Sequence, residues 1–381
     1  MLDCAVTEPL ATEELCAWLH LLHSPGVGRE AARRLLARFG SPRAAIEAPI
    51  AELGFCVDAP TALSLALAPD DHAQRLAATL AWRGAAAGRR LMVLGDADYP
   101  SALLHSADPP LLLFLQGDAG LLAEPCLAIV GSRQPSAQGR DNARRFAREL
   151  AAQGWTIVSG LAAGIDAAAH EGALAAGRRT IAVMGTGINL VYPPRHLALA
   201  QRISEQGLLV SELPLGAPPL GAHFPQRNRI IAGLSRGTLV IEAALRSGSL
   251  ITARLAAESG REVMAVPGSI LSAQSAGCHA LIRQGAALVD SPEQVAEELG
   301  PPTLPATTRP ALTEATPPPE THATAPDPVL LALGHDPMSL DALIDRCGCS
   351  AAALSARLLE LELDGRVARL PGGLYQRRQS G

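Results

Sequence analysis

Four short segments of the sequence place glycine beside small hydroxyl residues or arginine, and each lies near the end of an apolar run. Backbone N–H groups in such loops, together with the positive end of a following helix, bind anions, and phosphate is the natural ligand. Each segment alone is equally compatible with an ordinary turn in which glycine only permits the backbone angle. Four in one chain favour an anionic ligand, and they are Gly131-Ser132-Arg133, Ser159-Gly160, Gly185-Thr186-Gly187 and Ser247-Gly248-Ser249.

A fifth segment, HFPQRNRIIAGLS at residues 223–235, adds cations and an aromatic ring. Arg227 and Arg229 flank Asn228 near the start of an expected helix, and Phe224 is one of only five phenylalanines in the chain. The planar guanidinium group suits phosphate oxygens, and an aromatic ring beside it offers a surface on which a base can stack. The segment therefore predicts contact with the phosphate and the base of a nucleic acid.

A structural role is the alternative for each of these side chains. Phe224 would then lie in the core, and one arginine would pair with Glu212 or Glu242. We expect both interpretations to hold in part, with one arginine structural and another facing the ligand. Arg246 and Arg254, which lie near the fourth glycine loop, are further candidates for either role.

Asp166 and His170 stand four residues apart in GIDAAAH, so on a helix they would share one face. A metal pair or an acid–base pair is conceivable, but no third ligand stands at a useful spacing. We expect Asp166 to cap or stabilise the start of the helix and His170 to pack beneath a sheet.

The sequence lacks the common signatures of nucleotide and metal enzymes. It contains no GxxxxGK[ST] phosphate loop, no complete GxGxxG, no HExxH or GxSxG and no CxxC pair. We therefore expect no cofactor, no metal and no catalytic residue. The rival hypothesis is a Rossmann-like enzyme or sensor of free nucleotides that cleaves the N-glycosidic bond. Gly237-Thr238 followed by Glu242 matches the glycine loop and glutamate of such enzymes poorly.

Regular alternation of strands and helices must position these loops. Short, continuous apolar runs separated mostly by helix-length segments are typical of parallel strands buried on both faces. The pattern predicts an α/β fold with a central, extended Rossmann-like, doubly wound sheet, whose ligands bind at the carboxyl ends of the strands. The expected strands are Leu127 to Val130, Thr156 to Ser159, Thr180 to Met184, Leu208 to Ser211, Thr238 to Glu242, Glu262 to Val266 and Ala287 to Val289. Residues 86–125 hold a further strand, Leu91 to Leu94, and an apolar run, Leu111 to Gln116, which we expect to lean on these parallel strands.

An α-helical N-terminal domain is expected over residues 1–85, before the Rossmann-like domain at residues 86–300. Its Gly26-Val27-Gly28 segment resembles the turn of a helix-hairpin-helix or SAM-like unit. The backbone of such a turn can grip a DNA phosphate or simply pack two helices together. The acidic residues in the neighbouring helices favour packing.

A proline-rich linker and a small C-terminal domain complete the chain. Residues 301–328 carry nine prolines, which predicts an extended or flexible linker. Residues 329–381 predict a winged-helix-like domain with a hairpin around Gly372-Gly373. Its second helix offers only Arg357 as a cation, so we expect protein contact or a modest role in DNA binding.

Charge and cysteine usage narrow the class of protein. The chain of 381 residues has a net charge of −5 and no lysine, but residues 121–290 carry 16 arginines against 11 acidic residues. This mildly basic centre hints at an anionic ligand. Seven scattered cysteines indicate reduced thiols, the acidic N-terminus argues against a signal peptide, and no apolar run approaches the roughly 20 residues of a membrane span. We expect a cytoplasmic protein.

A series of strings in fixed order resembles the DNA-processing protein A (DprA, or Smf) family. They extend over residues 96–290 and include AIVGSR, SGLAAGIDAAAH, IAVMGTGINLVYP, LLVSELP, HFPQRNRIIAGLS and SGSLITARLAAESGREVMAVPG. The resemblance implies a cytosolic bacterial protein of natural transformation that binds and shields incoming single-stranded DNA without sequence preference. It also implies a homodimer, formed through the Rossmann surfaces, that loads a RecA-type recombinase onto the strand.

The DNA-binding pocket that the resemblance implies maps onto three of the segments described above. A lysine found in some pockets of the family has no lysine counterpart here, because every basic residue is arginine. We predict a non-enzymatic binder of single-stranded DNA in which Arg133, Arg227 and Arg229 hold phosphates and Phe224 stacks on a base. The predicted DNA-binding residues are Gly131, Ser132, Arg133, Ser159, Gly160, Phe224, Arg227, Asn228, Arg229, Ser247, Gly248, Ser249 and Arg254.

Overall fold

A large central sheet organises the protein. The computed structural model describes residues 10–302, 327–334, 337–347, 349–370 and 372–378. Within them, nine strands form one sheet in the order β1-β2-β6-β5-β4-β3-β7-β8-β9. The strands are β1 Arg89–Val93, β2 Leu112–Gly117, β3 Cys126–Val130, β4 Thr156–Ser159, β5 Thr180–Val183, β6 Leu208–Ser211, β7 Ser235–Val240, β8 Glu262–Ala265 and β9 Ala287–Leu288.

The order of the strands confirms the predicted doubly wound α/β fold. Strands β3 to β9 are parallel, and every residue of β3, β4, β5 and β6 is buried. From β3 the chain builds first toward β6 and then, on the other side, toward β9. Ligands of such sheets bind where the order reverses, which here is between the carboxyl ends of β3 and β7. The segment expected to lean on this domain adds one edge of the sheet, where β2 pairs antiparallel with β6 and β1 antiparallel with β2.

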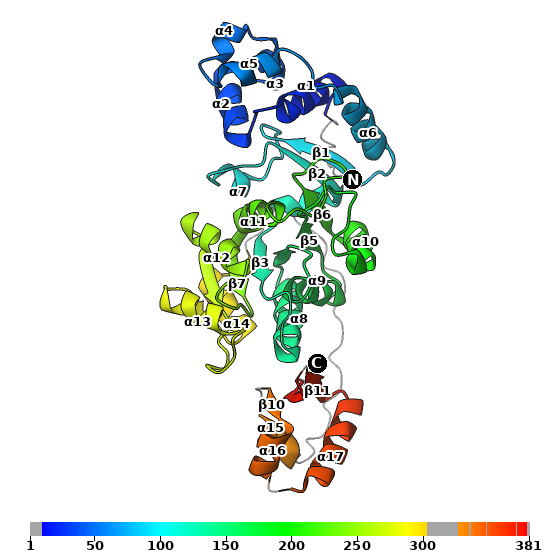
Figure 1. Ribbon diagram of the computed structural model, residues 1–381, viewed down its shortest axis with the longest axis vertical. Coiled ribbons are helices and arrows are strands. Elements are labelled where there is room, and N and C mark those ends of the chain that lie inside the picture. The colour runs from blue at the N-terminus through cyan, green and yellow to red at the C-terminus, as the bar shows by residue number, and fades with distance from the viewer. Residues whose placement is uncertain (1–9, 303–326, 335–336, 348, 371, 379–381) are drawn as a thin grey trace.

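Helices cover both faces of the sheet (Figure 1). On one face, Phe146 and Leu150 of α8 share a buried cluster with Leu127 of β3. On the other, Ile231 of α11 shares a buried cluster with Val130. The helices around the sheet are α7 Ser101–Leu104, η1 Ala119–Ala123, α8 Ala137–Ala152, α9 Ile165–Ala175, η2 Pro194–His196, α10 Leu197–Gln206, α11 His223–Leu234, α12 Ser249–Glu258, α13 Ala276–Arg283 and α14 Pro292–Leu299.

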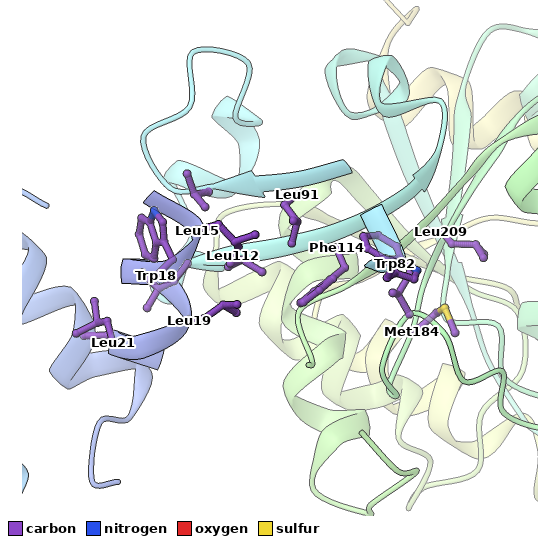
Figure 2. Packing of buried hydrophobic residues seen from close by; sticks show 14 of the residues in the cluster. Leu15, Trp18, Leu19, Leu21, Trp82, Leu91, Leu112, Phe114, Met184 and Leu209 are labelled. Atoms are coloured by element: carbon purple, nitrogen blue, oxygen red, sulfur yellow. The ribbon is translucent and has the colours of Figure 1, made fainter. Parts of the chain in front are cut away.

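An N-terminal helical unit packs on the antiparallel edge of the sheet. Figure 2 shows Leu15 and Trp18 of α1 beside Leu112 of β2, in a cluster that also holds Trp82 and Phe114. The Trp82 and Phe114 rings meet edge to face, with their centroids 5.5 Å apart. The unit consists of α1 Thr12–His23, α2 Arg29–Phe39, α3 Pro42–Glu47, α4 Ile50–Leu53, α5 Ala59–Leu65 and α6 His72–Gly84.

The turn between α1 and α2 lies against α5. The Val27 N–H donates to the Ser24 carbonyl oxygen and the Gly28 N–H to that of Gly26, both at 3.1 Å. Gly26 has a φ of +85°, and a Cβ atom there would lie 2.3 Å from Oγ1 of Thr61. Because two of its N–H groups are bonded inside the turn and its backbone lies against α5, this segment fits the packing alternative.

The C-terminal unit is the predicted winged helix. Its described elements are α15 Pro328–Leu333, β10 Met338–Ser339, α16 Leu340–Cys347, α17 Ala351–Leu363, β11 Val367–Leu370 and β12 Leu374–Arg377, with a sheet order of β10-β12-β11. Most of the expected linker, residues 303–326, lies outside the described residues.

The winged unit docks on α8 through β12, at the opposite end of the long axis from the helical unit (Figure 1). Gln376 and Gln138 exchange hydrogen bonds: the Gln138 N–H donates to Gln376 Oε1 at 3.2 Å, and Gln376 Nε2 donates to Gln138 Oε1 at 3.1 Å. Arg378 and Asp141 add an ion pair at 3.4 Å. In the part of the chain that the structure describes, no helix has the length and apolarity needed to cross a bilayer.

Candidate functional site

The loop after β3 lies where the sheet reverses its strand order. A Cβ atom on Gly131 would lie 2.7 Å from Cγ1 of Ile165 and 2.8 Å from the carbonyl oxygen of Glu242, so only glycine lets the loop pass between them. The Ser132 N–H donates to that same Glu242 oxygen at 2.6 Å, and the Ser132 carbonyl accepts from the Ile165 N–H at 3.1 Å. The backbone of this loop is therefore fixed by β7 and α9.

The first turn of α8, which we expected to offer free N–H groups to an anion, is already occupied. The Glu242 carboxylate accepts from the Ser136 N–H at 2.9 Å and from the Ser136 hydroxyl at 2.5 Å. The same hydroxyl accepts from the Gly139 N–H at 2.9 Å, and Oε1 of Gln376 accepts from the Gln138 N–H. Burial raises the pKa of Glu242, against the lowering effect of the bonds from Ser136. The expectation of free N–H groups is therefore wrong for Ser136, Gln138 and Gly139, for which the chain supplies its own acceptors.

A cavity of about 680 Å³ opens at the carboxyl ends of β3 and β7. The loop after β3, the start of α11 and the loop before α12 form its walls. The Asn228 side chain donates to the Gly248 carbonyl oxygen at 3.2 Å, which holds that loop against α11. The structure brings together here the predicted residues Gly131, Ser132, Arg133, Phe224, Arg227, Asn228, Ser247, Gly248 and Ser249.

Arg133 and Phe224 lie side by side in the lining of this cavity. The guanidinium carbon of Arg133 lies 5.2 Å from the centroid of the Phe224 ring, a cation–π arrangement. The Arg133 side chain is exposed, and so is Arg246, which lines the same cavity. Two exposed guanidinium groups and an aromatic ring can together bind phosphate and a stacked base.

Arg227 also lies in the cavity wall, but it is only 6% exposed. One terminal nitrogen donates to the carbonyl oxygens of Gly160 and Val183, at the ends of β4 and β5. Burial lowers the pKa of Arg227 to about 10, although the Asp166 carboxylate acts in the opposite direction. The Arg227 side chain thus connects α11 to the ends of β4 and β5.

Arg229 does not line the cavity. Its side chain is 10% exposed and pairs with Asp108 at 2.8 Å and with Glu212. Arg29 of α2 also reaches Asp108, at 3.1 Å, so the network joins the helical unit to the sheet. Burial acts to raise the pKa of Asp108, but Arg229, Arg33 and Arg29 together lower it. Of the two roles expected for an arginine of this segment, Arg229 has the structural one, an ion pair with Glu212.

Two other predicted residues also stand apart from the large cavity. Ser159 is fully buried, and its hydroxyl donates to the Ile129 carbonyl oxygen at 2.6 Å. Arg254 is exposed on α12, outside the lining of the cavity. Ser159 therefore braces β4 against β3, and no structural task is visible for Arg254.

Asp166 supports the loop after β4. Its carboxylate accepts from the Gly160 N–H at 3.1 Å and from the Ala162 N–H at 3.4 Å. Burial raises the pKa of Asp166, against the opposing effect of Arg227. The expected structural role holds, although the carboxylate braces the preceding loop instead of capping α9.

His170 is buried beneath the sheet, as expected. Its Nδ1 lies 2.8 Å from the Thr180 hydroxyl, which itself donates to the Ile157 carbonyl oxygen at 2.6 Å. Nδ1 must therefore carry the proton, and Nε2 is buried without a partner. Burial lowers the pKa of His170 to about 3. Within the described residues, no group of three or more potential metal ligands occurs.

A smaller cavity of about 200 Å³ adjoins the large one and shares Arg133, Phe224 and Arg227 with it. The predicted glycine loops after β4 and β5 line this second cavity, so the strand-end loops form two hollows instead of one. It also holds Tyr192 and Arg195, which sequence reasoning missed. The available signal was a tyrosine shortly after the third glycine loop, in a chain with only three tyrosines.

The fold and the site define a class of protein: a doubly wound α/β protein with an arginine-lined cavity at the switch point of its sheet. The sequence matches the DNA recombination-mediator protein A family over residues 90–300. It also matches the DprA winged helix domain over residues 313–373 and the DprA-like N-terminal HHH domain over residues 12–49. The chain belongs to the DNA recombination-mediator protein A family.

Named relatives cover most of the chain. Protein Smf of Escherichia coli is 46% identical over 286 residues, which span 74% of this chain and 76% of the relative. DNA processing protein DprA of Streptococcus pneumoniae is 50% identical over 203 residues, spanning 53% of this chain and 72% of the relative.

Two solved structures are similar to this one. The X-ray structure of DNA processing protein A from Streptococcus pneumoniae matches with a TM-score of 0.66 and 38% identity, covering 77% of this chain and 99% of that one. A structure of DNA processing protein A from Helicobacter pylori, described for its single-stranded DNA binding mode, matches with a TM-score of 0.50 and 32% identity. It covers 55% of this chain and 95% of that one.

Proposed function

We propose that this protein binds single-stranded DNA in the large cavity, without sequence preference. Exposed Arg133 and Arg246 contact phosphates, and Phe224 offers a stacking surface. The observation that carries the proposal is the Arg133 guanidinium, held 5.2 Å from the Phe224 ring centroid within a cavity of about 680 Å³. A phosphate beside Arg133 would place an attached base near this ring, which is the arrangement that strand-binding proteins use.

The two other arginines of the predicted site support it indirectly. Arg227 holds the loop after β4 against α11, and Arg229 belongs to the ion pairs that join the helical unit to the sheet. Both support the shape of the site, while Arg133 and Arg246 supply the accessible charge.

The occupied helix start favours a strand over a free nucleotide. Enzymes that hold a nucleotide phosphate on a helix N-terminus need free N–H groups there. In α8 the Glu242 carboxylate and the Ser136 hydroxyl use that position. Glu242 is also bonded twice to Ser136, so it is not free to act on a glycosidic bond. We therefore propose a binding protein and no catalytic activity.

Family membership supports the rest of the proposal. The Helicobacter pylori relative binds single-stranded DNA, according to the description of its structure. We propose that the present chain acts as a cytoplasmic homodimer that protects incoming DNA during natural transformation and passes it to a RecA-type recombinase. Two cavities in one dimer would lengthen the bound strand and raise avidity. Size exclusion with recombinase, with and without oligonucleotide, tests the partner.

Fluorescence anisotropy with labelled oligo-dT tests the binding itself. We expect Arg133→Ala to weaken binding about tenfold at physiological salt, because a charge-assisted contact is lost. Arg178→Ala is the control, since that exposed arginine lies just before β5, at the opposite edge of the sheet from the cavity. Unchanged affinity in Arg133→Ala would overturn the site. Thermal stabilisation by nucleoside monophosphates but not by oligo-dT would favour the nucleotide enzyme or sensor instead.

A further inference from the structure

A single residue, Glu242, holds the loop that carries Arg133 at both of its ends. The Glu242 carbonyl oxygen accepts from the Ser132 N–H at 2.6 Å. The Glu242 carboxylate accepts from the Ser136 N–H at 2.9 Å and from the Ser136 hydroxyl. Arg133 lies between these two anchors, one residue after Ser132 and three before Ser136. The backbone on either side of Arg133 is therefore fixed by one residue that lies just after β7.

Two glycines make room for Glu242 against this loop. A Cβ atom on Gly139 would lie 2.3 Å from Cδ of Glu242, so a side chain there would displace the carboxylate from the first turn of α8. A Cβ atom on Gly131 would lie 2.8 Å from the Glu242 carbonyl oxygen. The close approach of Glu242 to the loop depends on the absence of side chains at both facing positions.

The backbone around Glu242 is itself held in place. The Ile241 N–H donates to the Val130 carbonyl oxygen at 3.1 Å, and the Ala243 N–H donates to the Gln274 carbonyl oxygen at 2.7 Å. The residues on either side of Glu242 are thus bonded to β3 and to the segment before α13. An anchor that is fixed in this way can hold the loop in one conformation.

The charge of Glu242 does not explain its position. A carboxylate behind a loop that binds phosphate opposes the charge of the ligand. The Glu242 side chain is partly buried and lines neither of the two cavities described above. Its hydrogen bonds to the loop, rather than a contact with the ligand, account for a carboxylate at this place.

We propose that Glu242 is a positioning residue for DNA binding and that it acts through Arg133. The proposal rests on the proposed function, because it assumes that Arg133 contacts a phosphate. A loop that must be ordered during binding costs conformational entropy, whereas a loop that is already fixed avoids this cost. Glu242 therefore raises the affinity for a strand that it does not touch.

A double-mutant cycle on oligo-dT binding, measured by anisotropy, tests the proposal. We expect Glu242→Ala to weaken binding about fivefold, because the ligand must then order the loop. In a protein that already carries Arg133→Ala, the same change should weaken binding less than about twofold, since the residue through which Glu242 acts is missing. Equal losses in the two backgrounds would overturn the proposal.

The variant Glu242→Gln tests whether the hydrogen bonds are the cause. It keeps one side-chain oxygen that can accept from the Ser136 N–H, so it should retain most of the affinity that Glu242→Ala loses. An affinity as low as that of Glu242→Ala would overturn the positioning role.

Glu124→Ala is the matched control for a general loss of stability. It removes another partly buried carboxylate, which accepts from the Thr156 hydroxyl at 2.6 Å, at the opposite end of β3 from the loop. We expect it to lower the melting temperature and to leave the affinity of the folded protein unchanged. A loss of affinity equal to that of Glu242→Ala would show that destabilisation alone weakens binding, and would overturn the proposal.

Hydrogen exchange followed by mass spectrometry gives a measure that does not depend on DNA. In Glu242→Ala the amides of residues 131–139 should exchange faster, while those of β4 and β5 should not change. Unchanged exchange in the loop would overturn the positioning role, and so would faster exchange with unchanged affinity; both results would leave the proposed function intact. If the unaltered protein does not bind oligo-dT at all, the proposed function fails and the positioning role fails with it.

Discussion

A methyl group on Gly160 would lie 2.1 Å from Nη1 of Arg227, the nitrogen that donates to the Gly160 carbonyl oxygen. The absence of a side chain at position 160 therefore lets a buried guanidinium close on the end of β4. The same nitrogen also reaches Val183 at the end of β5, so this one contact fixes α11, and with it Phe224, relative to the edge of the sheet.

We predict that Gly160→Ala lowers the free energy of unfolding by about 1–3 kcal/mol, because the added methyl group displaces the buried Arg227 guanidinium from its two carbonyl acceptors. Urea unfolding followed by circular dichroism measures the change. Gly248→Ala is the matched control, since a Cβ atom there meets nothing within 4 Å, and we expect a change of less than about 0.5 kcal/mol. Equal losses in the two variants would contradict this account of Gly160.

Removal of Arg229 should affect stability more than DNA binding. Arg229→Met removes the nearly buried partner of Asp108 and Glu212 and leaves them only the more exposed Arg29 and Arg33, so we expect the free energy of unfolding to fall by about 2 kcal/mol. Arg144→Met, which breaks a half-exposed pair with Glu171, should cost less than about 1 kcal/mol. Anisotropy on the folded protein checks the second half of the prediction: a large loss of affinity in Arg229→Met with normal stability would return Arg229 to the binding site.

The salt dependence of binding should count the arginines that touch phosphate. Each contact releases counterions, and for a single strand it contributes about 0.7 to the slope of log affinity against log salt. We expect Arg133→Ala and Arg246→Ala each to reduce the slope by about that amount. Arg178→Ala, an exposed arginine just before β5, should leave it unchanged. Titrations of oligo-dT between low and physiological salt give the slopes, and an unaltered slope in Arg133→Ala would mean that Arg133 makes no phosphate contact.

His170 should make the fold sensitive to acid. Its pKa is lowered to about 3 in the folded protein, so the unfolded chain takes up the proton first as the pH falls through the ordinary histidine range. Stability from this group is therefore complete above the unfolded pKa of about 6.5 and is progressively lost below it, by roughly 2 kcal/mol at pH 5. His170→Asn should flatten this dependence between pH 7.5 and pH 5 in thermal unfolding. Parallel curves for the two proteins would show that other groups control it.

The strands of the sheet could be located from the sequence because each is a short apolar run buried on both faces. Thr156–Ser159 and Leu208–Ser211 were predicted to the residue. The direction of a strand relative to its neighbour could not be predicted in the same way. β2 also looks like a short apolar run, yet it pairs antiparallel with β6, which follows some 90 residues later in the chain. Only tertiary packing decides such a partner, so the antiparallel edge was not foreseen.

The roles of Arg227 and Arg229 could likewise be predicted only in part from the sequence. Arg227 and Arg229 are two positions apart on α11, so their side chains leave the helix about 200° apart and cannot both face one cavity. The spacing alone indicates that one must be structural. Which contacts each makes depends on Gly160 and Asp108, which are distant in sequence. A single sequence does not show which charged side chains will be buried by partners distant in the chain. It does show the loops at the strand ends, because each is a local pattern that follows an apolar run.

The paired amides of Gln138 and Gln376 give the winged unit a share in the first turn of α8, close behind Arg133 in the chain. Under the proposed function, ligand binding at the loop after β3 and docking of the C-terminal unit on the first turn of α8 would act on neighbouring segments of the chain. If ligand binding changes the affinity of docking by some factor, thermodynamic linkage requires that docking changes the affinity for the ligand by the same factor. A C-terminal domain docked beside the cavity loop can in this way respond to whether the cavity is filled.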